Sequence, residues 1–570
     1  MIVRQPRLSA ALLLAAAVAL MAPHVVTDAD ALSRLAMGRL LWQQHMLPAS
    51  DPFTFSAPGV RFGNPEWLGD LGLYAVHSFA GEHGLALFVI AVASLGYALA
   101  LWLATAFGAR ATTSLALLLC TLPAAAPRIA PRNDIHLLWL VPLFGLLAWH
   151  APVRRGCVLG MAALAWLWAS LHSSFLLGAV LLAAAIWETP RRSRGPALVL
   201  LAIYPALPWL GLSGRSTYDQ LLDHLVGAPV YRALLSEWMS PLTSGGVLAI
   251  LPLYVFSVLG TLVLWSESQR IRPVPLALFV VGCVLAYSSR RFLLVVGCMI
   301  VPPTAAAFDA WSGRTSASVR RFVVVIGTLC VLSYCALGAA SSARRTVASV
   351  FEREAGPAPA VRFMADHAPA GSRIANAFDD GPWLLWLAGA SPQRLRHYLD
   401  PRNNLGSAVL ARYVYEILAD PSAFEREVQR LGITLTLLPV HGVRTLSLLR
   451  HLVSSREWRL AYWDGRYVLY AREADVNREL LDSFGYRVLR PTLDLRYLEH
   501  GVSHAELARD LTRLERQSTL HADVIRAYLA LRDGDRERVR RAAEFLQKVW
   551  PRLPDAVELG EALRARGAIE

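Results

Sequence analysis

Residues 84–107 read GLALFVIAVASLGYALALWLATAF, a run of twenty-four residues without a charged side chain. The hydrocarbon core of a bilayer is about 30 Å thick, and a helix needs roughly 17 to 25 apolar residues to cross it. Ten further apolar runs of this kind precede residue 341: 8–25, 111–127, 134–151, 156–171, 173–188, 195–213, 245–265, 273–288, 291–309 and 322–340. The sequence therefore predicts a polytopic α-helical membrane protein with about eleven transmembrane helices.

The charged residues divide the chain into two parts. Of its 570 residues, 17% are charged, against about 25% in an average protein. Only thirteen Asp and Glu precede residue 345, and thirty follow it. We expect a transmembrane domain over 1–344, a soluble α/β domain over 345–480 and a helical cap over 481–570.

Arginines in alternate loops predict the orientation of the chain. Positively charged residues gather in cytoplasmic loops. Here they lie before the first apolar run and after the second, fourth, sixth, eighth and tenth runs: Arg4, Arg7, Arg110, Arg154, Arg155, Arg191, Arg192, Arg194, Arg270, Arg272, Arg314, Arg320 and Arg321. The N-terminus is then cytoplasmic. Loops 26–83 and 214–244 and all residues after 341 face outside. This placement also accounts for the net charge of +13 without a nucleic-acid partner.

The soluble part alternates strand-like and helix-like stretches. Short segments rich in β-branched and aromatic residues predict strands at 373–378, 396–399, 435–438, 458–462 and 467–470, and helical spacing predicts helices at 359–368, 406–418, 422–431 and 443–454. Asp464-Gly465 lies between two predicted strands and is a hairpin signal. A small α/β domain is the expected result.

Acidic residues gather in the first outer loop. Asp28 and Asp30 follow the first apolar run, and Asp51 and Glu66 come later in the same loop. Two carboxylates beside a membrane helix can bind a divalent cation or act as a general base. The alternative is that Asp28 or Asp30 caps the helix expected over residues 31–45.

Several other polar residues are predicted to face outside. His172 lies at the outward tip between two short helices, and either catalysis or a structural role suits it. Outward arginines run against the orientation rule, so they suggest binding of a lipid phosphate, or else contact with lipid headgroups. The arginines are Arg128, Arg132, Arg290 and Arg291.

The order of these motifs resembles the bacterial GT-C superfamily of membrane glycosyltransferases, in a branch with an outer C-terminal domain. The matching pieces are Asp28-x-Asp30, Gly38, Pro48-x-x-Asp51-Pro52-Phe53, Glu66-Trp67-Leu68, Trp168 to Phe175, Ser236-Glu237-Trp238, Arg290-Arg291-Phe292, Phe378 to Trp386 and Tyr398 to Arg402. Ser170, Ser173 and Pro401 depart from the branch's usual residues.

The resemblance implies a glycosyltransferase of the bacterial inner membrane with its C-terminal domain in the periplasm. The donor would be a sugar on a polyprenyl phosphate or pyrophosphate, and the acceptor a lipid, a glycan or a protein. Asp28 or Asp30 would be the base, with or without a divalent metal ion. Asp51, Glu66 and His172 would complete the catalytic group, and Arg128, Arg132, Arg290, Arg291 and Glu237 the donor site.

Two other functions are compatible with the sequence. One is a non-catalytic assembly or scaffold protein that binds a partner through the periplasmic domain. The other is a transporter, which predicts internal repeats and polar residues in the middle of helices; the sequence shows no repeat, and the helix centres are almost free of charge. The glycosyltransferase hypothesis predicts that the five catalytic candidates converge on one outward-facing cavity.

Overall fold

The structure is a computed structural model. It describes residues 6–60, 62–154, 156–212, 214–243, 247–266, 272–314, 318, 349–388, 395–402, 405–491, 495–498 and 502–532. The chain divides into two compact units. The first comprises residues 1–49, 61–352 and 406–408, and the second 50–60, 353–405 and 409–570. Segment 50–60 therefore belongs to the second unit, whereas the residues on either side of it belong to the first.

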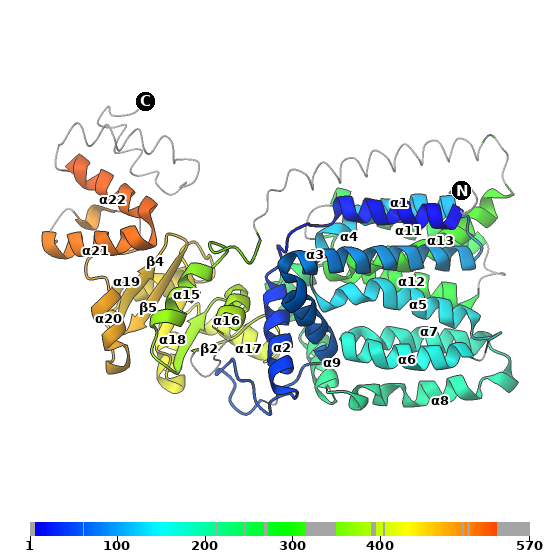
Figure 1. Ribbon diagram of the computed structural model, residues 1–570, viewed down its shortest axis with the longest axis horizontal. Coiled ribbons are helices and arrows are strands. Elements are labelled where there is room, and N and C mark those ends of the chain that lie inside the picture. The colour runs from blue at the N-terminus through cyan, green and yellow to red at the C-terminus, as the bar shows by residue number, and fades with distance from the viewer. Residues whose placement is uncertain are drawn as a thin grey trace. The chain divides into compact units, whose positions relative to one another are not determined.

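Helices form the described part of the first unit (Figure 1). They are α1 (Pro6–Met21), α2 (Asp30–Gln44), α3 (Trp67–Ala106), α4 (Ala111–Ala125), α5 (Leu137–His150), α6 (Gly156–Leu171), α7 (Leu176–Glu188), α8 (Gly195–Ile203), α9 (Ser216–Val226), α10 (Ala228–Leu234), α11 (Val247–Ser266), α12 (Pro273–Ser288) and α13 (Leu293–Ser312). Short 3₁₀ turns join them: η2 (Ala126–Arg128), η3 (Asn133–His136), η4 (Ser173–Phe175), η5 (Arg191–Ser193), η6 (Tyr204–Leu210), η7 (Ser236–Trp238) and η9 (Arg290–Phe292).

Most of these helices run side by side, and α2 lies across their ends (Figure 1). Helix α13 packs against α3, α4, α5, α11 and α12 and is buried along most of its length. Among the described residues, Trp67–Ala106 and Arg290–Ser312 are long and apolar enough to cross a membrane. Shorter apolar helices lie at Pro6–Met21, Gly156–Leu171, Ser173–Glu188, Gly195–Leu210, Leu253–Leu262 and Pro273–Ser288.

Helices occupy ten of the eleven predicted apolar runs, and the eleventh, 322–340, lies outside the described residues. The number that cross the membrane remains a prediction. The apolar run predicted over 84–107 corresponds to the part of α3 that follows Gly81, and the helical stretch before Gly81 was not predicted. Residues 67–80 are helical, and the chain breaks at Gly81, whose φ of 63° favours glycine. The first outer loop is thus largely helical.

Gly38 sets how closely α2 approaches α3. A Cβ atom at this position would lie 2.2 Å from the carbonyl oxygen of Asp70 and 2.4 Å from Cβ of Tyr74. Even a methyl group therefore requires the two helices to separate. Since α2 carries Asp30 and α3 carries Asp70, the contact also fixes the spacing of the polar side chains on these two helices.

We expect Gly38→Ala to destabilise the protein by about 1–3 kcal/mol, the usual cost of overpacking a tight contact. The melting temperature in detergent measures this loss. Gly72→Ala is the matched control, because a Cβ at this helical position meets nothing within 4 Å. An unchanged melting temperature for Gly38→Ala would show that the α2–α3 contact is not tight.

The second unit is built on a five-stranded mixed sheet in the order β2-β1-β3-β5-β4. The strands are β1 (Ser372–Asn376), β2 (Leu395–His397), β3 (Leu435–Pro439), β4 (Trp458–Trp463) and β5 (Tyr467–Arg472). Strand β1 pairs in parallel with β2 and β3, and β5 pairs antiparallel with β3 and β4. All five predicted strands are confirmed, as is the β4–β5 hairpin, in which Gly465 has a φ of 87°.

Helices accompany the sheet: α15 (Ala358–His367), α16 (Gly381–Leu387), α17 (Ser407–Arg412), α18 (Pro421–Leu431), α19 (Leu446–Ser454), α20 (Arg478–Phe484), α21 (His504–Gln517) and α22 (Thr519–Arg532). Four of them match the predicted helices. The three-way division at 344 and 480 remains a prediction, and residues 533–570 of the expected cap lie outside the described residues.

Segment 50–60 lies along the β2 edge of this sheet. The N–H of His397 donates to the carbonyl of Phe53 (3.0 Å), and Thr54 forms a parallel bridge with His397. The Ser56 hydroxyl donates to the carbonyl of Tyr398 (2.5 Å). These bonds cover an edge that would otherwise present unpaired backbone groups.

Candidate functional site

Arg132 lies at the centre of a charged cluster built from three loops of the first unit. Its guanidinium binds both oxygens of Asp28, with Nη2 3.0 Å from Oδ1. The same Nη2 lies 2.9 Å from Oδ2 of Asp30, and Nη1 lies 2.8 Å from Oε2 of Glu237. Asp28 comes from the α1–α2 connection, Asp30 is the first residue of α2, Arg132 comes from the turn before α5, and Glu237 from η7. Residues about 100 positions apart thus share one network.

Arg128 extends this cluster. Its Nη2 lies 2.9 Å from Oδ2 of Asp134, and its Nη1 lies 3.3 Å from Oε2 of Glu237. Glu237 therefore joins two arginines. Burial alone would raise the pKa of Glu237, but Arg132, Arg291 and Arg128 outweigh it and hold the pKa well below its usual range. Glu237 stays ionised, which suits a residue that positions arginines.

Asp28 and Asp30 have different surroundings although they are two residues apart. The N–H of Asp30 donates to Oδ1 of Asp28 (3.0 Å), so the Asp28 side chain helps to begin α2. Asp30 makes no side-chain cap. Burial raises the pKa of Asp30 to about 6, with Arg132 opposing the rise and Asp28 and Glu237 adding to it. A general base works best with a pKa near the working pH. Asp30 is therefore a stronger candidate for the catalytic base than Asp28.

A second polar group lies where α2 meets α3. Arg34 Nη1 lies 2.8 Å from Oε2 of Glu66, and Asn133 donates from Nδ2 to Oδ1 of Asp70 (2.6 Å) and Oε2 of Glu66 (3.2 Å). Asn64 donates to the other Asp70 oxygen (2.7 Å). Glu66, Asp70, Asn64 and Asn133 are buried. Burial alone would raise the pKa of Glu66, but Arg34 and the hydrogen bond from Asn133 bring it below its usual value.

His172 joins this second group through Glu66. The N–H of Ser174 donates to Nδ1 of His172 (3.1 Å), so the ring carries its proton on Nε2. That nitrogen faces Oε1 of Glu66 at 3.4 Å. Burial lowers the pKa of His172, against the attraction of Glu66 and Asp134. The Nε2 edge of the ring thus lies beside the Glu66 carboxylate.

Five members of the site were not predicted: Arg34, Asn64, Asp70, Asn133 and Asp134. Two of them carried a signal in the sequence. Arg34 follows Asp30 by four residues, and Asp70 follows Glu66 by four, so each pair lies on one helix face. Asn133 had no such signal, because its role depends on the fold that brings η3 against α3.

Arg290 and Arg291 form a turn bound to η7. The N–H of Arg290 donates to the carbonyl of Met239 (3.0 Å), and the Ser289 hydroxyl donates to the carbonyl of Glu237 (2.7 Å). The Arg291 guanidinium lies over the ring of Trp238, 4.6 Å from its centroid. Within the described part of the chain, neither guanidinium forms an ion pair with a carboxylate, although the charge of Arg291 acts on Glu237 at longer range. They differ in this from Arg128 and Arg132, whose charge is offset by Asp28, Asp30, Asp134 and Glu237.

Asp51 belongs to the second unit, unlike the other predicted site residues. Its Oδ2 accepts a hydrogen bond from Nη2 of Arg402 (2.9 Å). Arg402 also binds both oxygens of Asp400, at 2.7 and 2.8 Å. These contacts attach segment 50–60 to the sheet. The convergence of Asp51 with Asp28, Asp30 and Glu66 remains a prediction.

The donor set at Asp28 and Asp30 does not fit a metal ion well. Both carboxylates are bonded to Arg132, so its guanidinium lies where a bound cation would be. Over the described residues, no group of three or more His, Cys, Asp and Glu side chains is arranged to hold a metal ion. We therefore derive no chemical step through a metal.

Comparisons with known proteins identify the fold. No family model matches the sequence, and no curated protein matches it. Among solved structures, the chain resembles the oligosaccharyltransferase of Archaeoglobus fulgidus tethered to an acceptor peptide with an NVT sequon, with a TM-score of 0.51 and 13% identity. The match covers 82% of this chain and 74% of that one.

Two further structures give the same result. One is AglB from Archaeoglobus fulgidus in complex with an inhibitory peptide and a dolichol-phosphate, with a TM-score of 0.50, 13% identity, and coverage of 82% of this chain and 74% of that one. The other is the mycobacterial arabinofuranosyltransferase AftD, with a TM-score of 0.51 and 13% identity. That match covers 83% of this chain and 40% of AftD. The chain has the fold of GT-C membrane glycosyltransferases, which agrees with a location in a membrane.

Proposed function

We propose that the chain is a glycosyltransferase that moves a sugar from a polyprenyl-phosphate carrier to an acceptor at the outer face of the bacterial inner membrane. The observation that carries this proposal is the cluster of Asp28, Asp30, Arg132 and Glu237, gathered from three loops of a GT-C fold. The alternation of loop arginines supports the orientation, with the second unit in the periplasm.

Transfer requires a base on the acceptor and positive charge on the departing phosphate. Asp30 is the base that we assign. Its carboxylate takes the proton of the acceptor hydroxyl while that oxygen attacks the anomeric carbon. The bond between the anomeric carbon and the phosphate oxygen breaks, and the electron pair leaves with the polyprenyl phosphate. Attack opposite to the leaving phosphate inverts the anomeric centre.

Arg291 and Arg290 are the cations that we assign to the phosphate. Their guanidinium groups are not paired with carboxylates in the described residues, and a guanidinium fork matches phosphate oxygens. Arg132, Arg128 and Glu237 then act as positioning residues, because their charges are already matched by one another and by Asp28, Asp30 and Asp134. Glu66 and His172 brace α2 through Arg34. The dolichol-phosphate of the archaeal complex belongs to a protein of the same fold.

Arg291→Ala should weaken binding of a polyprenyl phosphate at least tenfold. Hydrogen bonds to charged groups contribute about 1.5–3 kcal/mol, and 1.4 kcal/mol is a factor of ten. Native mass spectrometry of the protein titrated with the lipid measures this loss. Arg192→Ala, at an exposed arginine of η5, controls for the loss of one charge. Equal binding by both variants would remove Arg291 from the site.

Absence of lipid binding by the wild-type protein would favour the scaffold function instead. A scaffold that binds a partner through the second unit has no need of a phosphate carrier. The titration thus separates the two functions before the donor sugar is known.

A further inference from the structure

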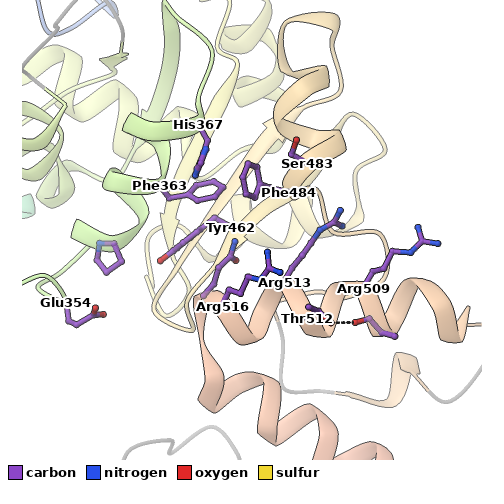
Figure 2. A pocket seen from close by; sticks show the side chains of 13 residues that line it. Glu354, Phe363, His367, Tyr462, Ser483, Phe484, Arg509, Thr512, Arg513 and Arg516 are labelled. Atoms are coloured by element: carbon purple, nitrogen blue, oxygen red, sulfur yellow. Dashed lines mark hydrogen bonds between the residues drawn. The ribbon is translucent and has the colours of Figure 1, made fainter.

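The second unit contains a cavity of about 700 Å³ that the proposed transfer reaction does not use. It lies between a wall of aromatic side chains and helix α21 (Figure 2). Cavities of about 300–1,000 Å³ are typical of binding sites for small ligands. Its residues come from α15, β4, α20 and α21, with Glu354 from the segment before α15, all within one compact unit. Glu354 is the carboxylate among them, so the arginines outnumber it.

Three aromatic rings and a histidine form one wall. The ring centroid of Phe363 lies 5.0 Å from that of Tyr462 and 5.0 Å from that of Phe484, which it meets edge to face. His367 lies 4.4 Å from Phe484. Phe363 and Phe484 are only partly buried although both are large apolar side chains. They therefore present apolar surface to whatever enters the cavity.

Helix α21 is fixed against this wall by buried hydrogen bonds. Oδ2 of Asp510 accepts three backbone N–H groups, from Arg487 (2.9 Å), Val488 (2.7 Å) and Leu489 (3.0 Å). Oε1 of Gln517 accepts from the backbone of Trp463 (2.9 Å). Bonds from the middle and from the last residue of α21 therefore fix this helix against the rest of the second unit.

Arginines on α21 face the aromatic wall (Figure 2). The Arg513 guanidinium is already bound within the protein, because it donates to the carbonyl of Gly485 (2.5 Å) and lies 3.5 Å from Asp510. Arg509 and Arg516 are exposed and have no carboxylate partner among the described residues. They are seven residues apart, so their backbones are about 10 Å apart along the helix. The cavity thus presents two available cations beside aromatic rings.

We propose that this cavity binds an acidic oligosaccharide. The face of an aromatic ring is negative and attracts the weakly positive C–H groups on the flat side of a sugar. A guanidinium binds the carboxylate or phosphate groups of such a sugar with paired hydrogen bonds. Two acidic groups about 10 Å apart with a sugar ring between them match Arg509, the aromatic wall and Arg516. This site does not depend on the proposed transfer reaction.

An acidic peptide fits this cavity less well. Extended peptides commonly bind by adding a strand to an open sheet edge. Here β4 is the nearest edge strand, and two of its outer backbone groups already have partners. The carbonyl of Leu460 accepts from the N–H of Tyr486 (2.8 Å), and the N–H of Trp463 donates to Gln517. A ligand must therefore be recognised by side chains.

Calorimetric titration of the full-length protein in nanodiscs tests the proposal. The probes are trigalacturonate, neutral maltotriose and tetraglutamate. We expect trigalacturonate to bind at least tenfold more tightly than either of the other two. The double variant Arg509→Ala/Arg516→Ala should lose at least tenfold of this affinity. Phe484→Leu should also weaken it, because a branched aliphatic chain has no ring face.

Arg450→Ala is the matched control, since Arg450 is an exposed arginine of α19 outside the cavity. It should bind trigalacturonate as the wild type does. Three results would overturn the proposal: no binding of trigalacturonate, equal binding of tetraglutamate, or an equal loss in Arg450→Ala and the double variant. The arginine variants change exposed side chains only, so a melting temperature near that of the wild type is expected for both.

Discussion

Asp30→Asn is expected to lower the rate of sugar transfer by about a hundredfold or more, because general-base catalysis contributes roughly 10²- to 10⁴-fold. Asparagine keeps the size of the side chain but cannot take a proton. The measurement is transfer from a polyprenyl-linked donor by protein reconstituted in lipid. The melting temperature of the Asp30→Asn variant should stay close to that of the wild type. The side chain that accepts a backbone N–H at the start of α2 is that of Asp28, not that of Asp30.

The pH profile separates a base from a residue that only positions others. Burial raises the pKa of Asp30 to about 6. A base is active when ionised, so wild-type activity should fall as the pH drops through about 6 and be fully present above it. The residual activity of Asp30→Asn should lack this step.

Asp28→Asn is the matched control for the loss of one charge. The asparagine keeps a side-chain oxygen that can accept from the N–H of Asp30. Like Asp30→Asn, the substitution also deletes one of the carboxylates that pair with Arg132. We expect a smaller loss of activity, with the pH step retained. If neither substitution affected transfer, Asp30 would not be the base and the enzyme function would fail.

Arg402→Ala is expected to destabilise the second unit by about 3–5 kcal/mol, the usual effect of removing one partner of a buried ion pair. Arg402 and Asp400 are each 6% exposed. Burial alone would raise the pKa of Asp400, but Arg402 and His397 hold it well below its usual range. Without Arg402, the carboxylates of Asp400 and Asp51 would remain buried with fewer partners.

Pulse proteolysis of the full-length protein in urea measures this loss. Asp400→Asn in the Arg402→Ala background should recover part of the stability, because it removes one of the stranded charges. Arg450→Ala, at an exposed site, should change stability little. A loss below about 1 kcal/mol for Arg402→Ala, the level of a surface pair, would contradict the role of this arginine in holding segment 50–60.

Local patterns predicted the elements of the fold well. The strands at 435–438 and 467–470 and the turn at Asp464-Gly465 follow from β-branched residues and from a glycine in the left-handed region. The Asp379-Asp380-Gly381 and Asp400-Pro401-Arg402 segments follow the neighbouring strands β1 and β2. The helical stretch 67–80 was not predicted, because its residues are less apolar than 84–107; the break at Gly81 separates it from the predicted run.

The candidate site could be predicted only in part. Chain position grouped Asp28 with Asp30, and the orientation rule placed Arg132 and Glu237 on the same side of the membrane. That Arg132 binds Glu237, 105 residues away, depends on packing between helices. The same is true of Arg34 with Glu66 and of the assignment of Asp51 to the second unit. Pattern analysis found the residue types but not their partners.

A structure of the protein in a lipid nanodisc with bound polyprenyl phosphate tests the central proposal most directly. We predict density for the phosphate against the guanidinium of Arg291, next to Trp238, on the side of the first unit that carries Asp30 and Arg132. Phosphate density only beside Arg191 and Arg192, or lipid density with no phosphate near Arg291, would contradict the assignment of this cluster as the site of transfer.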